Sequence, residues 1–123
     1  MPMANHSMWL GSLAFAAVAA HAMAAWADRT PAVAQGARLA QDVSKGNCLA
    51  CHAMPSDAMA VTSANIGPPL IAIRARFPDR ERLRRQIWDA GSINPDTVMP
   101  PFGKHQILTT QEIDLIVDYL YTL

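Results

Sequence analysis

The sequence is poor in the residues that cross-link small domains. Of its 123 residues only two are cysteine and four are histidine, which allows one internal disulfide or one small metal site at most. Basic and acidic residues number ten each, and this balance gives no general case for binding nucleic acid. No segment alternates polar and apolar residues as a β-strand does. The sequence therefore predicts an all-α fold, and its length allows one compact domain.

Charged residues are also missing from the first 27 positions. Residues 9–20 form an apolar core, and residues 25–27 match the small-x-small pattern that signal peptidase reads. This core is shorter than the ~20 residues of a membrane span. The basic residues that usually precede the core of a secretory signal are missing. We expect residues 1–27 to be a cleaved secretory signal, with a retained membrane anchor as the alternative. Residues 28–123 would then be the mature domain, without a membrane span.

Three segments of the mature domain have the apolar spacing of amphipathic helices. We expect helices over residues 32–45 and 79–90, each followed by a glycine, and a third helix that begins at Thr109. Thr109 and Glu112 have the spacing of a capping box. The apolar stripe that follows this box is formed by Ile113, Ile116, Val117 and Leu120.

Two long connections, residues 53–66 and 92–108, are rich in Pro, Gly, Ser and Asn. Structureless loops of this length are uncommon in a small domain unless something organises them. A small domain also buries a limited core and often needs a metal or a cofactor. We therefore expect a bound group on which the loops pack.

Both cysteines lie in one short motif, C-L-A-C-H at residues 48–52. This spacing is the signature of covalent haem attachment, because two thiols add to the vinyl groups at one porphyrin edge and the next residue then lies beneath the iron. We predict one haem c, attached through Cys48 and Cys51, with His52 as an axial ligand. The alternatives are a redox dithiol, which needs a βαβ context that the sequence lacks, a zinc site that adds His105, and a structural disulfide.

The sixth iron ligand decides whether such a haem transfers electrons or binds small molecules. Its candidates are Met54, Met59, Met99 and His105. The first two are too close in sequence to the axial histidine to reach the opposite face easily. Met99 lies in a loop that two prolines make rigid, and we predict it as the ligand, with His105 as its rival. A thioether stabilises ferrous iron and raises the reduction potential relative to a second histidine.

The order of these features resembles that of the class I cytochromes c. It runs from a first helix and the C-x-x-C-H motif through a Gly-Pro-x-Leu turn and a methionine loop to an amphipathic last helix. The resemblance implies a small all-α fold, with three or more helices around one haem. It also implies that the first and last helices cross at Gly36 and at Tyr119 and Leu120. A carbonyl in the turn at residues 65–70 can orient His52, and the resemblance assigns that role to Pro68.

A narrower resemblance rests on residues 46–55, 65–70 and 99–103, which are similar to the SoxX family. SoxX is the monohaem cytochrome subunit of the SoxAX complex in bacterial sulfur oxidation. The resemblance implies a periplasmic electron-transfer subunit that is not catalytic alone, with a SoxA-type cytochrome, the SoxYZ carrier protein and a downstream cytochrome as partners. Two alternatives remain: a free periplasmic electron shuttle, and a haem enzyme or gas binder with an open sixth position, against which Met99 argues.

Six of the ten basic residues are arginines within residues 74–85. Such a run is commonly a solvated helix face. Clustered arginine also favours interfaces and steers association, so a docking surface for a transient partner is the second interpretation. The sequence leaves both open.

Overall fold

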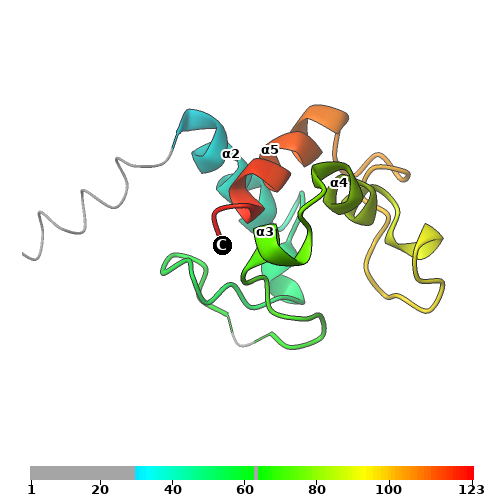
Figure 1. Cartoon of the computed structure of the whole chain (residues 1–123), viewed down its shortest axis with the longest axis horizontal. Helices are drawn as coiled ribbons and strands as arrows, with labels where there is room; N and C mark the ends of the chain where they lie inside the picture. The colour runs from blue at the N-terminus through cyan, green and yellow to red at the C-terminus, as the bar shows by residue number, and fades with distance from the viewer. Residues whose placement is uncertain (1–29, 63) are drawn as a thin grey trace, which may run out of the picture. The chain divides into compact units, whose positions relative to one another are not determined.

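The computed structural model describes residues 30–62 and 64–123, and the predicted signal at residues 1–27 lies outside them. Helices joined by long loops make up this part of the chain, in which no strand occurs (Figure 1). The prediction of an all-α domain is confirmed. The elements are α2 (Pro31–Gln41), a 3₁₀ turn (Cys48–Ala50), α3 (Ile73–Arg76), α4 (Arg80–Trp88), a second 3₁₀ turn (Ala90–Ser92) and α5 (Thr110–Leu120).

The first and last of these helices, α2 and α5, lie side by side and form the main helix contact of the domain (Figure 1). Gly36 makes the close approach possible, because a Cβ at this position would collide with the Leu115 carbonyl and lie 3.0 Å from the Tyr119 Cβ. Burial of the facing apolar side chains supplies the main stabilisation. These side chains are Ala37, Ala40, Ile113, Ile116, Val117, Tyr119 and Leu120.

The helix predicted over residues 32–45 is shorter, since α2 ends at Gln41. The Asp42 carboxylate accepts hydrogen bonds from both the backbone N–H and the hydroxyl of Ser44, at 2.7 Å each. An Asp side chain that binds the backbone two residues ahead favours a turn over a continuing helix. The same hydrogen bonds lower the pKa of Asp42. Val43, which the longer helix would have placed on its apolar stripe, is 82% exposed.

The second predicted helix, 79–90, is also shorter by one or two residues at each end, as α4. Asp79 caps it by accepting a hydrogen bond from the Glu81 N–H at 2.9 Å. After Trp88 the chain continues into the 3₁₀ turn rather than as α-helix. The short helix α3 was not predicted from the sequence. It follows Ala72, whose φ of 51° lies in the left-handed region.

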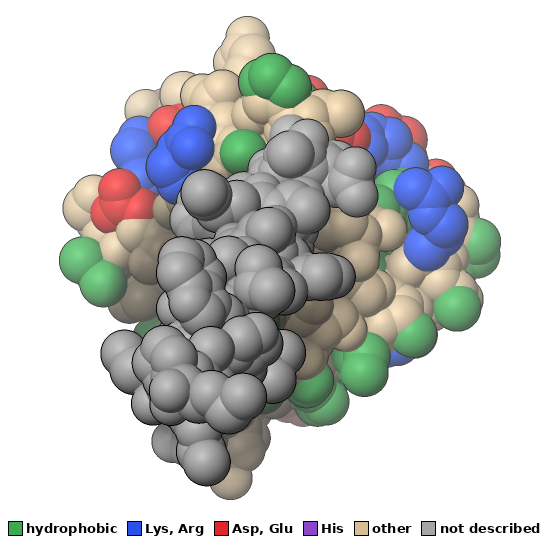
Figure 2. All heavy atoms as spheres, turned by 90° about the vertical axis from the view of Figure 1, so that its left-hand side faces the viewer, with side chains coloured by type: hydrophobic (Ala, Val, Ile, Leu, Met, Phe, Trp, Pro, Cys, Tyr) green, Lys and Arg blue, Asp and Glu red, His purple; other side chains and the backbone are tan. Residues whose placement is uncertain are grey.

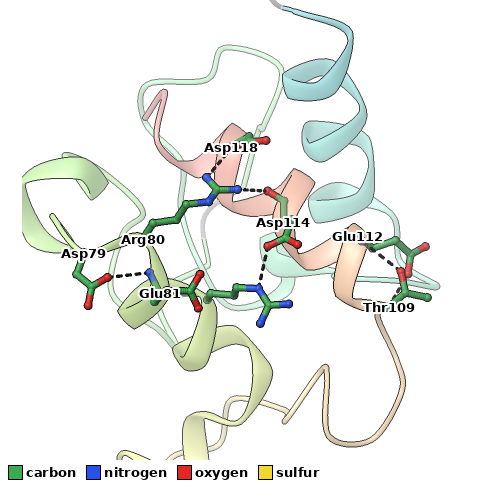
Figure 3. A network of polar contacts seen from close by, with 8 residues as sticks. Asp79, Arg80, Glu81, Thr109, Glu112, Asp114 and Asp118 are labelled. Atoms are coloured by element: carbon green, nitrogen blue, oxygen red, sulfur yellow. Dashed lines mark hydrogen bonds and ion pairs between the residues drawn. The ribbon is translucent and has the colours of Figure 1, made fainter.

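Two arginines of α4 pair with aspartates of α5, which joins these helices (Figure 3). Arg80 donates to the Asp118 carboxylate at 2.6 Å and to the Asp114 carbonyl at 3.1 Å. Arg84 donates to the Asp114 carboxylate at 2.8 Å. Part of the arginine-rich segment therefore makes internal contacts. On the face drawn in Figure 2, basic and acidic side chains lie beside one another rather than in separate patches.

The start of α5 has the capping box that its sequence predicts (Figure 3). The Thr109 hydroxyl accepts from the Glu112 N–H at 3.2 Å, and the Glu112 carboxylate accepts from the Thr109 N–H at 2.8 Å. Lys45 adds an ion pair of 2.7 Å to Glu112. Together these contacts hold the pKa of Glu112 below its ordinary value, with the Lys45 hydrogen bond as the largest cause. Among the described residues, no helix is long and apolar enough to cross a bilayer.

Candidate functional site

A cavity of about 630 Å³ opens between the cysteine motif, the turn at residues 65–70, helices α3, α4 and α5, and the loop of Met99. This volume is in the range of sites that hold a cofactor. Most of the side chains that line it are apolar. They include Leu70, Ile73, Phe77, Leu83, Ile87, Phe102, Leu108, Ile116 and Leu120.

The attachment motif forms a tight turn at the edge of this cavity. Asn47, with a φ of 46°, leads into the 3₁₀ turn, and the N–H groups of Cys51 and His52 both donate to the Cys48 carbonyl at 3.2 and 2.9 Å. Both thiols and the imidazole therefore line one cavity. Burial raises the pKa of the Cys48 thiol to about 11.

The His52 ring is oriented by the turn that faces it. Its Nδ1 lies 2.6 Å from the carbonyl oxygen of Pro68, and since a carbonyl only accepts, Nδ1 carries the proton. Nε2 is then the nitrogen with a free lone pair for a metal. Gly67 packs on the ring so closely that a Cβ there would collide with it.

Backbone hydrogen bonds hold this turn against the motif. The Gly67 N–H donates to the Cys51 carbonyl and the Leu70 N–H to the Ala53 carbonyl, both at 2.8 Å. From the other side Arg76 donates to the Pro69 carbonyl at 2.8 Å. The Pro68 carbonyl is thus fixed by its neighbours on both sides, and the orientation of His52 follows from it.

Of the four residues considered as sixth ligand, Met99 alone lines the cavity. Met54 is 2% exposed, and its sulfur lies 3.3 Å from the Tyr119 hydroxyl, within the core. Met59 and His105 are exposed and do not line the cavity. The structure therefore brings Met99 to the same cavity as Cys48, Cys51 and His52, and keeps the other three away.

Short-range hydrogen bonds shape the loop of Met99. The Met99 N–H donates to the Thr97 hydroxyl at 3.2 Å, and the Thr97 N–H donates to the Asn94 carbonyl at 3.1 Å. After the methionine, the buried Phe102 accepts at its carbonyl from the Ile107 and Leu108 N–H groups. Local hydrogen bonds therefore hold the loop on both sides of the Met99 thioether.

Two contacts, one in the cavity wall and one in the core, were not predicted from the sequence. Gln86 lines the cavity and contacts Met99. The sequence showed no sign of this role, because Gln86 is a single polar residue between Leu83 and Ile87 on the apolar side of α4. The buried Asp57 accepts a hydrogen bond from the Tyr119 hydroxyl at 2.7 Å, across 62 residues of sequence. No sequence signal joins that pair, because it depends on how the loop folds onto α5.

The donor set of the cavity fits a haem. Two thiols lie at its edge, an imidazole nitrogen and a thioether line its walls, and the remaining walls are largely apolar. In the described part of the chain no three His, Cys, Asp or Glu side chains gather as a metal site, so the alternative zinc site has no ligand cluster there. The two thiols are not joined. A redox dithiol would lie in a βαβ unit, and the fold described here is helical.

Comparison with known proteins agrees with this interpretation. A family model described as cytochrome c oxidase, cbb3-type, subunit III, matches residues 31–120. An uncharacterized lipoprotein of Aquifex aeolicus (strain VF5) is 38% identical over 77 residues, which are 63% of this chain and 36% of that protein. The chain thus matches only about a third of the length of this relative.

A haem bound in this cavity supplies an iron that takes up and releases one electron. The chain would hold it through the Cys48 and Cys51 thiols, would offer His52 and Met99 from the cavity walls, and would surround it with apolar side chains that influence its potential. With the family match over most of the chain, the Cys48 and Cys51 pair implies covalent attachment. The chain belongs to the cytochrome c family of the cbb3-type subunit III model, with covalently bound haem c.

Proposed function

We propose that this cytochrome is the electron-transfer subunit of a SoxAX-type complex in thiosulfate oxidation, exported to the periplasm by residues 1–27. The observation that carries the proposal is that residues 46–55, 65–70 and 99–103, the three segments similar to SoxX, each contribute to the walls of one cavity. In such a complex a SoxA-type subunit would conjugate thiosulfate to a carrier of the SoxYZ kind. The haem of this chain would accept the electrons and pass them to a further cytochrome.

The axial ligands in this proposal are His52 and Met99. A pair of protein ligands closes both faces of the iron, so the oxidation state changes with little change in coordination. The 2.6 Å contact between His52 and Pro68 supports the first ligand. The position of the Met99 thioether on the cavity wall supports the second.

A subunit needs an apolar surface near its redox centre, and the cavity offers one at its rim. Ile66 and Val98 both line the cavity and are 67% and 79% exposed. Exposed branched apolar side chains at the edge of a redox site are favourable contacts for a partner protein. We propose this pair as the contact with the SoxA-type subunit.

The partner is tested by affinity purification of the tagged chain from its native source. The wild type is expected to bring down a second cytochrome in a one-to-one ratio, and the double variant Ile66→Ser, Val98→Ser is expected to lose it. The matched control is Val43→Ser, Val61→Ser, whose side chains are 82% and 88% exposed but do not line the cavity. Recovery of the wild type without any second cytochrome would favour a free electron shuttle.

The ligands are tested by spectroscopy of the ferric protein. We expect the weak red absorption band of a thioether-ligated ferric haem. Met99→Ala should abolish this band and lower the reduction potential, because a thioether stabilises ferrous iron. Met54→Ala and Met59→Ala are the controls and should keep the band. A band that persists in Met99→Ala would contradict the assignment, and a wild-type protein without this band would favour the rival ligand His105.

A further inference from the structure

Gln86 is the polar side chain of α4 that reaches toward the Met99 sulfur. It lies half-buried between Leu83 and Ile87, the two buried apolar residues of this helix. Its Nε2 donates to the Met99 Sδ at 3.9 Å, and both residues line the cavity. An amide in an apolar wall carries a desolvation cost unless it is hydrogen-bonded, so this contact also explains how Gln86 is accommodated there.

A thioether sulfur has two lone pairs. If one lone pair binds iron, the other stays free to accept a hydrogen bond. We propose that Gln86 is a positioning residue that holds the second lone pair of Met99, and so sets the orientation and the donor strength of the sulfur. This inference rests on the proposal that Met99 is the sixth ligand, and it adds a second determinant of the reduction potential.

Neighbouring contacts hold Gln86 and Met99 in a fixed relative position. Two residues after Gln86, the Trp88 carbonyl accepts from the N–H groups of Gly103 and Lys104 at 3.1 and 3.2 Å. Gly103 also packs on the Trp88 ring, where a Cβ would collide with it. An ion pair of 2.9 Å joins Lys104 to Asp89. The last turn of α4 therefore fixes the far side of the methionine loop, while Gln86 contacts the methionine itself.

The direction of the effect follows from the amide dipole. The N–H group presents its positive end to the sulfur, and positive potential near the iron favours the ferrous over the ferric state. The same hydrogen bond also restrains the position of the sulfur. Removal of the N–H is expected to lower the reduction potential and to loosen the sulfur.

The test compares Gln86→Leu and Gln86→Glu in the haem-loaded protein with the control Gln111→Leu, which alters an exposed glutamine of α5. For Gln86→Leu we expect the ferrous preference to fall about threefold, which is about 28 mV for a one-electron couple. Displacement of the sulfur from ferric iron by added imidazole should become faster, on the order of threefold. Gln86→Glu removes the N–H and adds negative charge, so its potential should fall further. Gln111→Leu should match the wild type.

Three results would decide the matter. A potential that shifts while the thioether band and the melting curve stay in place supports a positioning role. An unchanged potential and an unchanged imidazole rate in both Gln86 variants, with the band still present, would overturn this inference and leave Met99 as ligand. A wild-type protein without the thioether band would overturn both the ligand assignment and the role of Gln86.

Discussion

The side of the molecule where α2 crosses α5 differs in kind from the side where loops surround the cavity. At the crossing, Ala40, Ile113, Val117 and Tyr119 are completely buried, at 0% exposure. Within residues 30–62 and 64–123, eight of the nine exposed large apolar residues lie instead outside the α-helices, with Trp88 as the exception. The loops keep their shape through prolines and backbone hydrogen bonds. Stability is thus concentrated at the crossing, and the redox properties are concentrated in the loops.

The largest loss of stability is expected from a larger side chain at the crossing of α2 and α5. Gly36→Val adds a branched side chain where even a Cβ collides with the Leu115 carbonyl. Overpacking of this kind lowers the free energy of unfolding by about 3 kcal/mol. Urea titration followed by circular dichroism measures it, with Gln35→Val, an exposed neighbour on the same helix, as the control. A loss no larger than that of Gln35→Val would show that the helices separate easily.

The link between the two sides is the hydrogen bond from Tyr119 to Asp57. Tyr119→Phe leaves the buried carboxylate without this donor, and we expect a loss of about 2 kcal/mol in the free energy of unfolding. The reduction potential should change little, because neither residue lines the cavity. Tyr121→Phe, which removes a 2.8 Å bond to the Phe77 carbonyl at a half-buried site, should cost less. An equal loss in both variants would mean that the burial of Asp57 adds nothing to the free energy lost with its hydrogen bond.

On the loop side, Gly67→Ala should act on the haem ligand rather than on the crossing. The new methyl group would push the His52 ring out of line, and we expect on the order of tenfold weaker binding of the imidazole to iron. An added ligand would then displace the ring at about tenfold lower concentration than in the wild type, as an absorption titration would record. Gly91→Ala is the control, because its Cβ meets only an ordinary contact at 3.4 Å. Identical titrations would contradict the role of this turn.

The capping box of α5 predicts an acid dependence of stability. The pKa of Glu112 is lowered on folding. Its contribution is therefore complete above the ordinary glutamate value of 4.5 and is lost as the pH falls through the lower folded-state value. Glu112→Gln keeps an acceptor for the Thr109 N–H but loses the ion pair with Lys45. It should cost about 0.5 kcal/mol at neutral pH and should flatten the decline in acid. An equally steep decline in the variant would assign it to other carboxylates.

The smallest effect is expected on the arginine face of α4. Arg82 lies over the Phe77 ring at 5.7 Å and makes no ion pair with α5 in the described part of the chain. Arg82→Glu should change the free energy of unfolding by less than about 0.5 kcal/mol. Arg80→Glu, which breaks the pair with Asp118 and adds a like charge, should cost about 1 kcal/mol. Equal effects in urea titrations would show that the ion pairs contribute nothing.

How much the sequence predicts differs between these sides as well. The capping box and apolar stripe predicted α5 because both signals are local. The C-x-x-C-H motif predicted the attachment site for the same reason. The premature end of α2 also had a local signal, an aspartate two residues before a serine, which the helical spacing outweighed. The contacts of Gln86 with Met99 and of Tyr119 with Asp57 had none, since they arise only when distant segments meet.

The bond between Tyr119 and Asp57 also bears on the order in which the chain is completed. A chain is synthesised from its amino terminus, so the attachment motif at residues 48–52 exists well before α5 does. The loop after the motif is tied to a hydroxyl that lies 62 residues downstream of Asp57. It can therefore take its final shape only after residue 119 has been made. Until then the motif lies in an unfinished, open segment, and the last helix closes the protein around the group that the motif holds.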